Sequence, residues 1–321
     1  MPLAEKEIIQ RIRSLAGRGP SLITGIGDDC AVLRVPPRHD LLVTTDFTIE
    51  GVHFRRHWHS PGLVGRRCLT RGLSDIAAMG GKPQAAFLSL AVASHVPQNW
   101  VDRFLKGLLD LADEFNLPLG GGDTAQSAAG IQADIVVVGS VPKGMAVLRS
   151  GAKPGEHIYV TGELGGGAAA LAQLIRMKKK LKPLPAPYSR FLSPQPRVAA
   201  GQTLRQRGLA SAMIDLSDGL STDLEHICQE SHVGAEIEAN SIPRAHIAPT
   251  QTLPLEFALH GGDDYELLFT SAGKLPSQLA GVRVTRIGRI VRSAGMKLIA
   301  ADGEPRKLKP GGWEHFKCGC S

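Results

Sequence analysis

The spacing of hydrophobic residues along residues 1–150 changes between that of a strand and that of a helix. Apolar residues at every third or fourth position, with charged residues between them, predict helices at the N-terminus and over 62–79 and 99–115. Short apolar runs bounded by polar or glycine residues predict strands over 31–35, 41–45, 85–93 and 133–141. This order of elements predicts one compact α/β unit.

The same change of spacing resumes after a turn-rich segment, 150–155, and we place a domain boundary near Gly151. The strands predicted beyond it cover 157–161, 212–215, 234–238, 266–270, 282–290 and 297–301. The helices predicted there cover 166–176, 198–207, 219–230 and 253–260. Five prolines in 182–196 exclude a continuous helix and predict a loop. The sequence therefore predicts an α/β fold with two domains, residues 1–150 and 151–321.

The length and composition are those of a soluble globular protein. At 321 residues the chain exceeds the size at which one hydrophobic core usually stops growing, which supports two domains. No run approaches the roughly 20 apolar residues of a membrane-spanning helix. The N-terminus lacks the uninterrupted apolar stretch of a secretory signal, and the five scattered cysteines do not resemble a disulfide framework. These features predict a cytoplasmic protein with no membrane partner.

The net charge of +7 does not by itself indicate a nucleic-acid partner. Basic residues are dispersed, and only 178–180 forms a short basic run. The excess aids solubility in the first place, and a positive field would also attract substrates that carry phosphate groups. A nucleotide- or RNA-binding protein without catalysis is a competing hypothesis, but clustered carboxylates would repel nucleic acid.

Aspartates recur beside glycine-rich or polar turns at six places. These are Gly27-Asp28-Asp29, Thr44-Thr45-Asp46, Ser74-Asp75, Gly121-Gly122-Asp123, Asp215-Leu216-Ser217-Asp218-Gly219 and Gly262-Asp263-Asp264-Tyr265-Glu266. One such aspartate alone is typical of a turn or a helix N-cap. Most of the six lie at the ends of predicted strands, and converging carboxylates repel one another unless cations neutralise them. Together they predict Mg²⁺, which prefers oxygen ligands and is shared with substrate phosphates.

Other catalytic and binding motifs find less support. The chain has no P-loop, nucleophile elbow, zinc-protease helix motif or protein-kinase catalytic set. Residues 162–167 follow a predicted strand and hint at a dinucleotide loop, but their glycines depart from the Gly-x-Gly-x-x-Gly spacing. Cys318 and Cys320 form an incomplete zinc site because a second pair of ligands is lacking. A magnesium-dependent enzyme that uses ATP is the preferred interpretation.

Seven segments, taken in order, resemble the thiamine-monophosphate kinases. They are GIGDDCAVL (25–33), TTDFTIEGVHF (44–54), LSDIAAMGGKP (73–83), GGDT (121–124), RSGAKPG (149–155), IDLSDGL (214–220) and GGDDYELLFT (261–270). The resemblance extends over nearly the whole chain. Single pieces recur in the wider superfamily of aminoimidazole ribonucleotide synthetase, selenophosphate synthetase and the hydrogenase maturation dehydratase. Another member of that superfamily, which would share the magnesium aspartates, is the alternative.

The resemblance implies a two-domain fold like that of aminoimidazole ribonucleotide synthetase. In this fold the N-terminal domain dimerises through its sheet, and ATP binds between it and the C-terminal α/β domain. The implied reaction converts ATP and thiamine monophosphate to ADP and thiamine diphosphate, and the implied assembly is a homodimer. Several Mg²⁺ ions would assist a direct in-line transfer, because a phosphate oxygen is already anionic and needs no protein base.

The resemblance also assigns roles to residues by position. The implied Mg²⁺ ligands are Asp29, Thr44, Thr45, Asp46, Asp75, Asp123, Asp215 and Asp218. The implied ATP contacts are Gly122, Asp123, Arg149 and Ser217. The implied contacts to thiamine monophosphate are His53, Asp263 and Trp313. Asp263 stands where the family often has Glu and Thr44 where it has Ser, so both positions keep an oxygen ligand.

Overall fold

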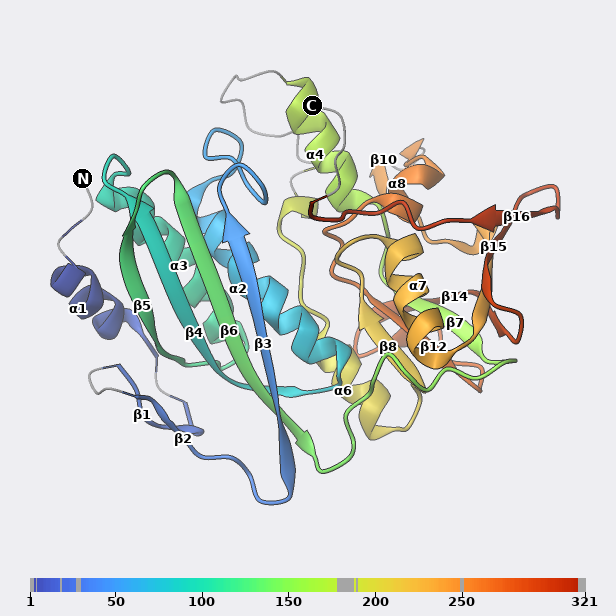
Figure 1. Cartoon of the computed structure of the whole chain (residues 1–321), viewed down its shortest axis with the longest axis horizontal. Helices are drawn as coiled ribbons and strands as arrows, with labels where there is room; N and C mark the ends of the chain where they lie inside the picture. Colours follow the sequence, from blue (N-terminus) through green and yellow to red (C-terminus); the bar gives the residue numbers. More distant parts are fainter. Residues whose placement is uncertain are drawn as a thin grey trace. The chain divides into compact units, whose positions relative to one another are not determined.

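The computed structural model describes residues 3, 5–17, 19–26, 30–177, 188, 190–248 and 251–316. These residues divide into two compact units, each with its own β-sheet (Figure 1). The first unit holds the described residues of 1–76 and 81–145, and the second holds those of 77–80, 146–178 and 183–321. None of the described helices is long and apolar enough to cross a membrane.

A four-stranded sheet in the order β3-β6-β4-β5 forms the first unit. Its strands are β3 (His39–Ile49), β6 (Ile131–Pro142), β4 (Lys82–Ala93) and β5 (Leu119–Ser127). The β4–β5 pair is parallel, and the other two pairs are antiparallel. The remaining elements are α1 (Glu5–Leu15), α2 (Pro61–Ala78), α3 (Gln98–Glu114) and a ribbon of β1 (Leu22–Thr24) and β2 (Val32–Leu33). Helices α2 and α3 lie behind the sheet in Figure 1 and cover one of its faces.

Strand β3 shows how the two faces of this sheet differ. Leu42 and Thr48 are buried on the helix-covered face, whereas Leu41, Val43 and Phe47 are 50%, 67% and 58% exposed. Successive side chains of a strand point to opposite faces, so the three exposed residues share the second face. Within the described part of the first unit, this second face carries an exposed apolar row, and we call it the open face.

Helices α2 and α3 approach each other most closely at glycines. A Cβ atom on Gly65 of α2 would lie 1.9 Å from the carbonyl oxygen of Phe104 in α3. A Cβ atom on Gly107 of α3 would lie 1.9 Å from the carbonyl oxygen of Gly62. The opposing atoms belong to the backbone, which cannot rotate away as the end of a side chain can. The crossing of the two helices therefore requires glycine at these positions.

A larger, mixed sheet forms the second unit, in the order β16-β15-β9-β14-β7-β12-β8, with β13 paired to β14. Its strands are β7 (His157–Thr161), β8 (Ala212–Asp215), β9 (Gly234–Glu238), β12 (Leu267–Ser271), β13 (Gln278–Leu279), β14 (Val282–Val291), β15 (Gly295–Ile299) and β16 (Pro305–Leu308). Its helices are α4 (Gly166–Arg176), α6 (Val198–Gln206), α7 (Leu220–Ser231) and α8 (Leu255–His260). Short pieces complete it: β10 (His246–Ala248), β11 (Gln251–Thr252), and two 3₁₀ turns, Arg190–Leu192 and Ala239–Ser241.

Helix α7 is the central helix of the second core. Its Leu224 and Ile227 are fully buried in one cluster with Ile214 of β8, Ile237 of β9 and Leu268 of β12. Strand β8 lies at one edge of the sheet and β9 lies several strands away, so the helix packs across several strands. The N-terminal end of α7 is thereby fixed beside the C-terminal end of β8, where two of the predicted ligands lie.

The predicted α/β fold class and most predicted elements are confirmed, and two differences concern the site. Strand β5 was not predicted, and it contains Gly122 and Asp123. Strand β3 was predicted to end at residue 45 but continues to Ile49, paired with β6 along its whole length. The prediction that Thr44-Thr45-Asp46 lies at a strand end is therefore wrong, since these residues lie inside β3.

We predict that Gly65→Ala lowers the free energy of unfolding by about 2 kcal/mol or more, since overpacking of this kind usually costs about 1–3 kcal/mol. Gly62→Ala in the same helix is the matched control, because its Cβ would lie 3.4 Å from the nearest atom, an ordinary contact. Chemical denaturation of both variants measures the difference. Equal stability of the two variants would show that the helices do not cross as described.

Candidate functional site

Three segments of the second unit meet at the N-terminal end of α7. They are the loop 216–219 after β8, the segment 261–266 before β12, and residues 311–313, which we call the C-terminal strap. The N–H of Asp263 donates to the carbonyl oxygen of Ser217 at 2.9 Å, and the N–H of Trp313 donates to that of Asp218 at 3.0 Å. The structure therefore makes neighbours of four residues that were predicted to contact metal, ATP or substrate.

Two predicted ligands in this region share their surroundings with a third carboxylate. Asp215, the last residue of β8, is buried, and Asp223 of α7 is only 1% exposed. Burial raises the pKa of Asp223 well above its usual range, and the nearby carboxylates of Asp215 and Asp218 raise it further. Asp223 is held by the N–H groups of Asp218 and Gly219, which donate to its Oδ2 at 3.2 and 3.0 Å. A bound cation would relieve this repulsion.

Sequence reasoning missed Asp223, although a signal was present. It lies four residues after Gly219, in the first turn of the helix, and acidic residues are favourable at that position because they accept free N–H groups. In the structure, the side chain of Asp223 reaches back from the first turn of α7 and accepts the N–H groups of Asp218 and Gly219, just before the helix. The cap fixes the loop that presents Asp218.

Asp264 has a structural role in the segment 261–266. Its carboxyl group accepts the N–H of Gly165 at 2.7 Å and that of Gly167 at 3.3 Å. Helix α4 begins with glycines that offer no capping side chain, so Asp264 supplies the cap from a distant part of the chain. Burial raises the pKa of Asp264 to about 8, although the two N–H groups favour its charged form.

Glu266, like Asp264, has a structural role. Its carboxylate forms a bidentate pair with Arg197, with 2.7 Å between Oε2 and the guanidinium Nε, and it also accepts the hydroxyl of Thr161 at 2.6 Å. Glu266 is 5% exposed, and a buried carboxylate needs such partners. The acids of this segment therefore differ in role: Asp264 caps α4, and Glu266 pairs with Arg197.

Asp263 has an uncommon backbone conformation. Its φ is 67° and that of Tyr265 is 53°, in the left-handed region that costs energy for residues other than glycine. The hydroxyl of Tyr265 donates to Oδ1 of Asp263 at 2.9 Å and orients the carboxylate. Such strain persists where surrounding contacts enforce it and is common at ligand sites. The geometry is consistent with the predicted substrate contact at Asp263.

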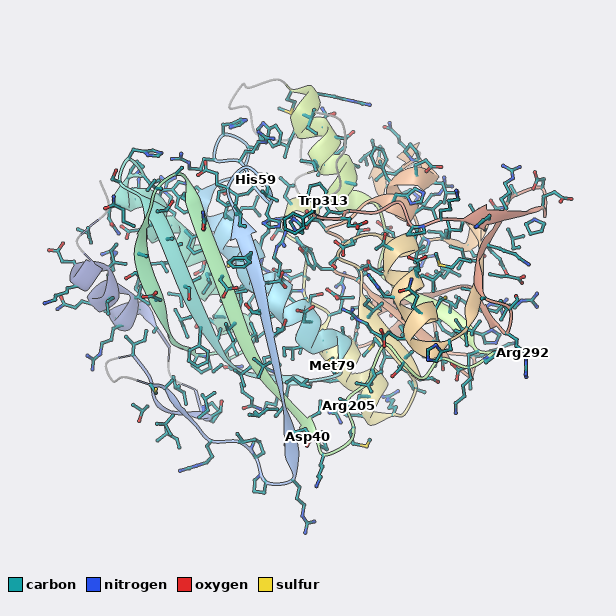
Figure 2. All side chains as sticks on the ribbon, in the orientation of Figure 1. Asp40, His59, Met79, Arg205, Arg292 and Trp313 are labelled. Carbon is teal, nitrogen blue, oxygen red and sulfur yellow. The ribbon has the colours of Figure 1, made fainter. Side chains whose placement is uncertain are left out.

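Trp313 is the exposed aromatic residue of the C-terminal strap. It is 54% exposed and follows two glycines (Figure 2). Its ring makes an edge contact with His315 at a centroid distance of 5.7 Å. Its face offers a surface on which a flat or cationic group can stack.

In the first unit, three predicted magnesium ligands lie on the helix-covered face of the sheet. The hydroxyl of Thr44 in β3 donates to Oδ2 of Asp75 in α2 through a short hydrogen bond. Asp46 lies two residues further along β3, on the same face, and its Oδ1 is 3.8 Å from the guanidinium of Arg71 in α2. The strand and the helix thus bring Thr44, Asp46 and Asp75 to one place.

Two other predicted ligands lie on the open face instead. The hydroxyl of Thr45 donates to Oδ1 of Asp134 at 2.7 Å. Asp134 pairs in register with Ser89 of β4, and Ser89 pairs with Asp123 of β5. Residues paired across strands point to the same face, so the sheet separates the side chains of Thr45 and Asp123 from the group that contains Asp46.

Gly122 precedes Asp123 at a place where the backbones of β4 and β5 are close. Its φ is 150°, and a Cβ atom would lie 1.8 Å from the carbonyl oxygen of Leu88. No other residue fits there without displacing β4. The glycine at this position is thus explained by strand packing, and its contact with ATP stays a prediction.

The remaining predicted site residues are more scattered. His53 accepts the N–H of Ile49 on Nδ1 at 3.0 Å, so the neutral ring carries its proton on Nε2. The carbonyl oxygen of Arg149 accepts the hydroxyl of Ser231 at 3.0 Å, at the C-terminal end of α7. Ser217 precedes the other end of this helix, about 18 Å away for 12 residues. Asp29 lies outside the described residues, as do Cys318 and Cys320.

No group of three or more His, Cys, Asp or Glu side chains among the described residues is arranged to hold a metal ion by itself. Mg²⁺ usually takes one or two protein carboxylates together with waters and substrate phosphates. The group on α2 and β3, and the crowded carboxylates beside α7, supply oxygen donors of that kind. The residues therefore fit Mg²⁺ that is bound together with a phosphate-bearing substrate.

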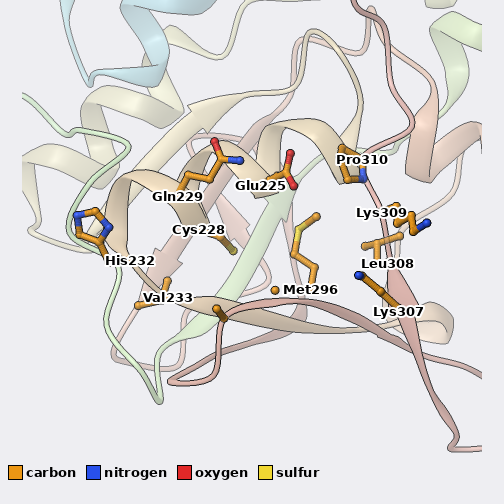
Figure 3. Close-up of a pocket in the computed structure, with 12 residues that line it drawn as sticks. Glu225, Cys228, Gln229, His232, Val233, Met296, Lys307, Leu308, Lys309 and Pro310 are labelled. Atoms are coloured by element: carbon orange, nitrogen blue, oxygen red, sulfur yellow. The ribbon is translucent and has the colours of Figure 1, made fainter.

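A cavity of about 860 Å³ lies elsewhere in the second unit, between α7 and the strands β15 and β16 (Figure 3). Cys228 and Met296 form part of its apolar floor, and Lys307 and Lys309 lie at its side. None of the predicted site residues lines it. The cavity and the site at the N-terminal end of α7 are therefore different places on the same helix.

Comparison with known families gives two matches that together cover most of the chain. The family model of the AIR synthase related protein, N-terminal domain, matches residues 27–141. The model of its C-terminal domain matches residues 153–300. The predicted two-domain fold of the aminoimidazole ribonucleotide synthetase type is thus confirmed.

The curated proteins that are similar to this chain include several thiamine-monophosphate kinases. The thiamine-monophosphate kinase of Escherichia coli (strain K12) is 40% identical over 306 residues, which cover 91% of each chain. That of Bacillus subtilis (strain 168) is 33% identical over 324 residues and covers 98% of this chain and 99% of its own. Identity of this extent over whole chains is what members of one family show.

Solved structures agree with the sequence comparison. The thiamine-monophosphate kinase of Stenotrophomonas maltophilia K279a has a TM-score of 0.83 and 36% identity, and the match covers 95% of this chain and 99% of that one. A structure described as AaThiL complexed with AMPPCP and TMP has a TM-score of 0.76 and 31% identity, with 88% and 89% covered. The hydrogenase maturation protein HypE of E. coli, at 18% identity and a TM-score of 0.74, shares the fold alone.

We predict that Asp264 makes the stability of the protein fall as pH rises. With a folded pKa of about 8 and an ordinary value of 3.8, its carboxyl group keeps a proton between these pH values only in the folded state. The unfolded chain binds fewer protons there, so the free energy of unfolding decreases from about pH 4 to pH 8. Asp264→Asn has no proton to lose, and its advantage over the wild type should grow across this interval.

Urea unfolding at pH 5, 6, 7 and 8 in the presence of a chelator measures this. Asp302→Asn is the control, because the N–H of Glu304 lowers the pKa of Asp302 and keeps it ionised throughout the interval. Parallel curves for the wild type and Asp264→Asn would mean that Asp264 is charged in the folded protein.

Proposed function

The chain belongs to the thiamine-monophosphate kinase family, and on that premise we propose that it transfers the γ-phosphoryl group of ATP to thiamine monophosphate. The products are ADP and thiamine diphosphate. The observation that carries the proposal is the meeting of Asp218, Asp263 and Trp313 at the N-terminal end of α7. A relative that is solved with AMPPCP and TMP supports both substrates.

The substrate contacts follow from the chemistry of thiamine monophosphate. Its thiazolium ring is cationic and its pyrimidine ring is flat, so the exposed face of Trp313 would attract and stack on it. The carboxylate of Asp263, oriented by Tyr265, would offset the positive charge. The Nε2–H of His53 is a donor suited to the phosphate.

We further propose that Mg²⁺ ions carry the phosphates of ATP. The proposed ligands are Asp29, Thr44, Thr45, Asp46, Asp75, Asp123, Asp215 and Asp218. Of these, Thr44, Asp46 and Asp75 form one described group, and Asp215 and Asp218 belong to a second. The metal would supply charge neutralisation for a phosphoryl group in transfer. Gly122, Asp123, Arg149 and Ser217 are the proposed contacts to ATP.

The transfer itself requires little from the protein besides position. A phosphate oxygen of thiamine monophosphate is anionic at neutral pH and can attack the γ-phosphorus without a base. Asp263 and Trp313 would hold the acceptor, and the aspartate groups would hold the donor phosphates in line. We therefore propose inversion at phosphorus and no covalent intermediate on the protein.

The open face of the first sheet supports a homodimer. Leu41, Val43 and Phe47 form an exposed apolar row on a regular strand, and such rows are usually covered by another surface. A second copy that presents the same row would bury both rows around a twofold axis. We also propose that the reaction takes place in the cytoplasm. The three cysteines among the described residues are free thiols, as a reducing compartment would keep them.

The release of ADP from ATP, with and without thiamine monophosphate, tests the function. We expect release that depends on both thiamine monophosphate and Mg²⁺, with thiamine diphosphate formed in equal amount. A member of the superfamily that activates an amide or carbonyl oxygen would hydrolyse ATP without forming thiamine diphosphate. That result would overturn the proposal.

We predict that Asp46→Asn reduces turnover at saturating Mg²⁺ to less than about a tenth of the wild-type value, a rise of more than about 1.4 kcal/mol in the barrier. The substitution removes a negative charge with little change in volume. Asp110→Asn is the control, since the ion pair of Asp110 with Lys106 is exposed on α3 and such pairs contribute little. Turnover near that of Asp110→Asn would remove Asp46 from the metal site.

We predict that Trp313→Ala raises the KM for thiamine monophosphate several-fold and leaves the KM for ATP nearly unchanged. Loss of a cation–π contact worth about 0.5–2 kcal/mol gives a change of this size. Steady-state kinetics with each substrate varied in turn measure it. Equal weakening of both substrates, or a large fall in melting temperature, would identify Trp313 as a structural residue.

A further inference from the structure

The C-terminal strap is held by hydrogen bonds from three successive backbone N–H groups. The N–H of Gly311 donates to the hydroxyl of Ser221 at 3.1 Å, and the N–H of Gly312 donates to the hydroxyl of Thr222 at 3.1 Å. The N–H of Trp313 then donates to the carbonyl oxygen of Asp218. All three acceptors belong to the first turn of α7 or to the loop before it.

The strap also fits tightly against this end of the helix. A Cβ atom on Gly311 would lie 2.7 Å from Nδ1 of His260, and one on Gly312 would lie 2.1 Å from the carbonyl oxygen of Asp218. Both glycines are therefore needed for the strap to reach the two hydroxyls. Residues 309–311 and 313–316 are exposed, so the strap has little apolar burial to hold it.

Ser221 is oriented for this task by a second partner. It is fully buried, and its hydroxyl lies 2.8 Å from Nδ1 of His260. The oxygen of Ser221 also accepts the N–H of Gly311, so two partners fix the position of this hydroxyl. The other ring nitrogen of His260, Nε2, lies 3.5 Å from Oε2 of Glu256 in the same helix, α8. The hydroxyl of Ser221 is thus engaged by two partners within the protein.

We propose that Ser221 and Thr222 are positioning residues that hold Trp313 against the thiamine-bearing substrate, although neither side chain touches that substrate. The inference rests on the proposed function for the identity of the substrate. The two hydroxyls fix the two residues before Trp313, and without them the indole loses its defined place. Their loss weakens binding of thiamine monophosphate, while binding of ATP is unaffected.

The test uses the full chain labelled with 5-fluorotryptophan, whose three tryptophans give three fluorine resonances. Trp313→Phe identifies the resonance of Trp313. Thr222→Val removes the hydroxyl and keeps the branched shape, and Ser221→Ala removes the other hydroxyl. We expect each of these two variants to shift and narrow the Trp313 resonance. We also expect each to raise the KM for thiamine monophosphate about three- to ten-fold. The KM for ATP and the melting temperature should stay nearly unchanged.

Two controls separate positioning from a general loss of structure. Thr222→Ser keeps the hydroxyl and should restore both the resonance and the KM. Thr203→Val removes a helix hydroxyl of the same unit that donates to the carbonyl oxygen of Ala199, and it should change neither.

The outcomes decide between the inference and the proposed function. An unchanged Trp313 resonance in Thr222→Val and Ser221→Ala overturns the positioning role. A released resonance with an unchanged KM for thiamine monophosphate overturns its link to the substrate. A wild-type protein that forms no thiamine diphosphate overturns the proposed function, and the fluorine spectra still report whether the two hydroxyls hold the strap.

Discussion

The second unit depends on the burial of carboxylates beside the N-termini of two helices. A buried carboxylate is unfavourable unless N–H groups or a cation compensate it, and helix starts offer such N–H groups. Asp223 takes this role at α7 and Asp264 at α4, while Glu266 is matched by Arg197. The same contacts fix the loop 216–219 and the segment 261–266. The geometry of the candidate site thus follows from how buried carboxyl groups are satisfied.

In the first unit, the two faces of the sheet determine where the side chains of β3 lie. Polar residues of β3 alternate between a face covered by α2 and an open face, so adjacent residues in one motif serve different surroundings. Thr44 meets Asp75 on one side, and Thr45 meets Asp134 on the other. A motif that is compact in sequence is therefore divided in space.

Much of the fold was predictable because apolar spacing distinguishes the buried helices and strands. Strand β5 was not, since LGGGDTAQS has few apolar residues and three glycines, and its strand geometry comes from pairing with β4. The neighbours Ser217, Asp218 and Asp263 could be named from motifs, but their contact depends on tertiary hydrogen bonds that no local pattern encodes. Asp223 was missed because a helix cap inside the helix looks like an ordinary surface acid.

The cap on α4 has a consequence for the order of folding. The N-cap of α4 is Gly165, with φ of 87°, and the first two residues of the helix are glycines, which favour the unfolded chain. The carboxyl group that completes its first turn is 99 positions later in the chain. The helix can therefore not be stabilised by local interactions alone, and it must wait for a long loop to close. We expect α4 to gain hydrogen-exchange protection only after β12 has docked beside β7 and β8.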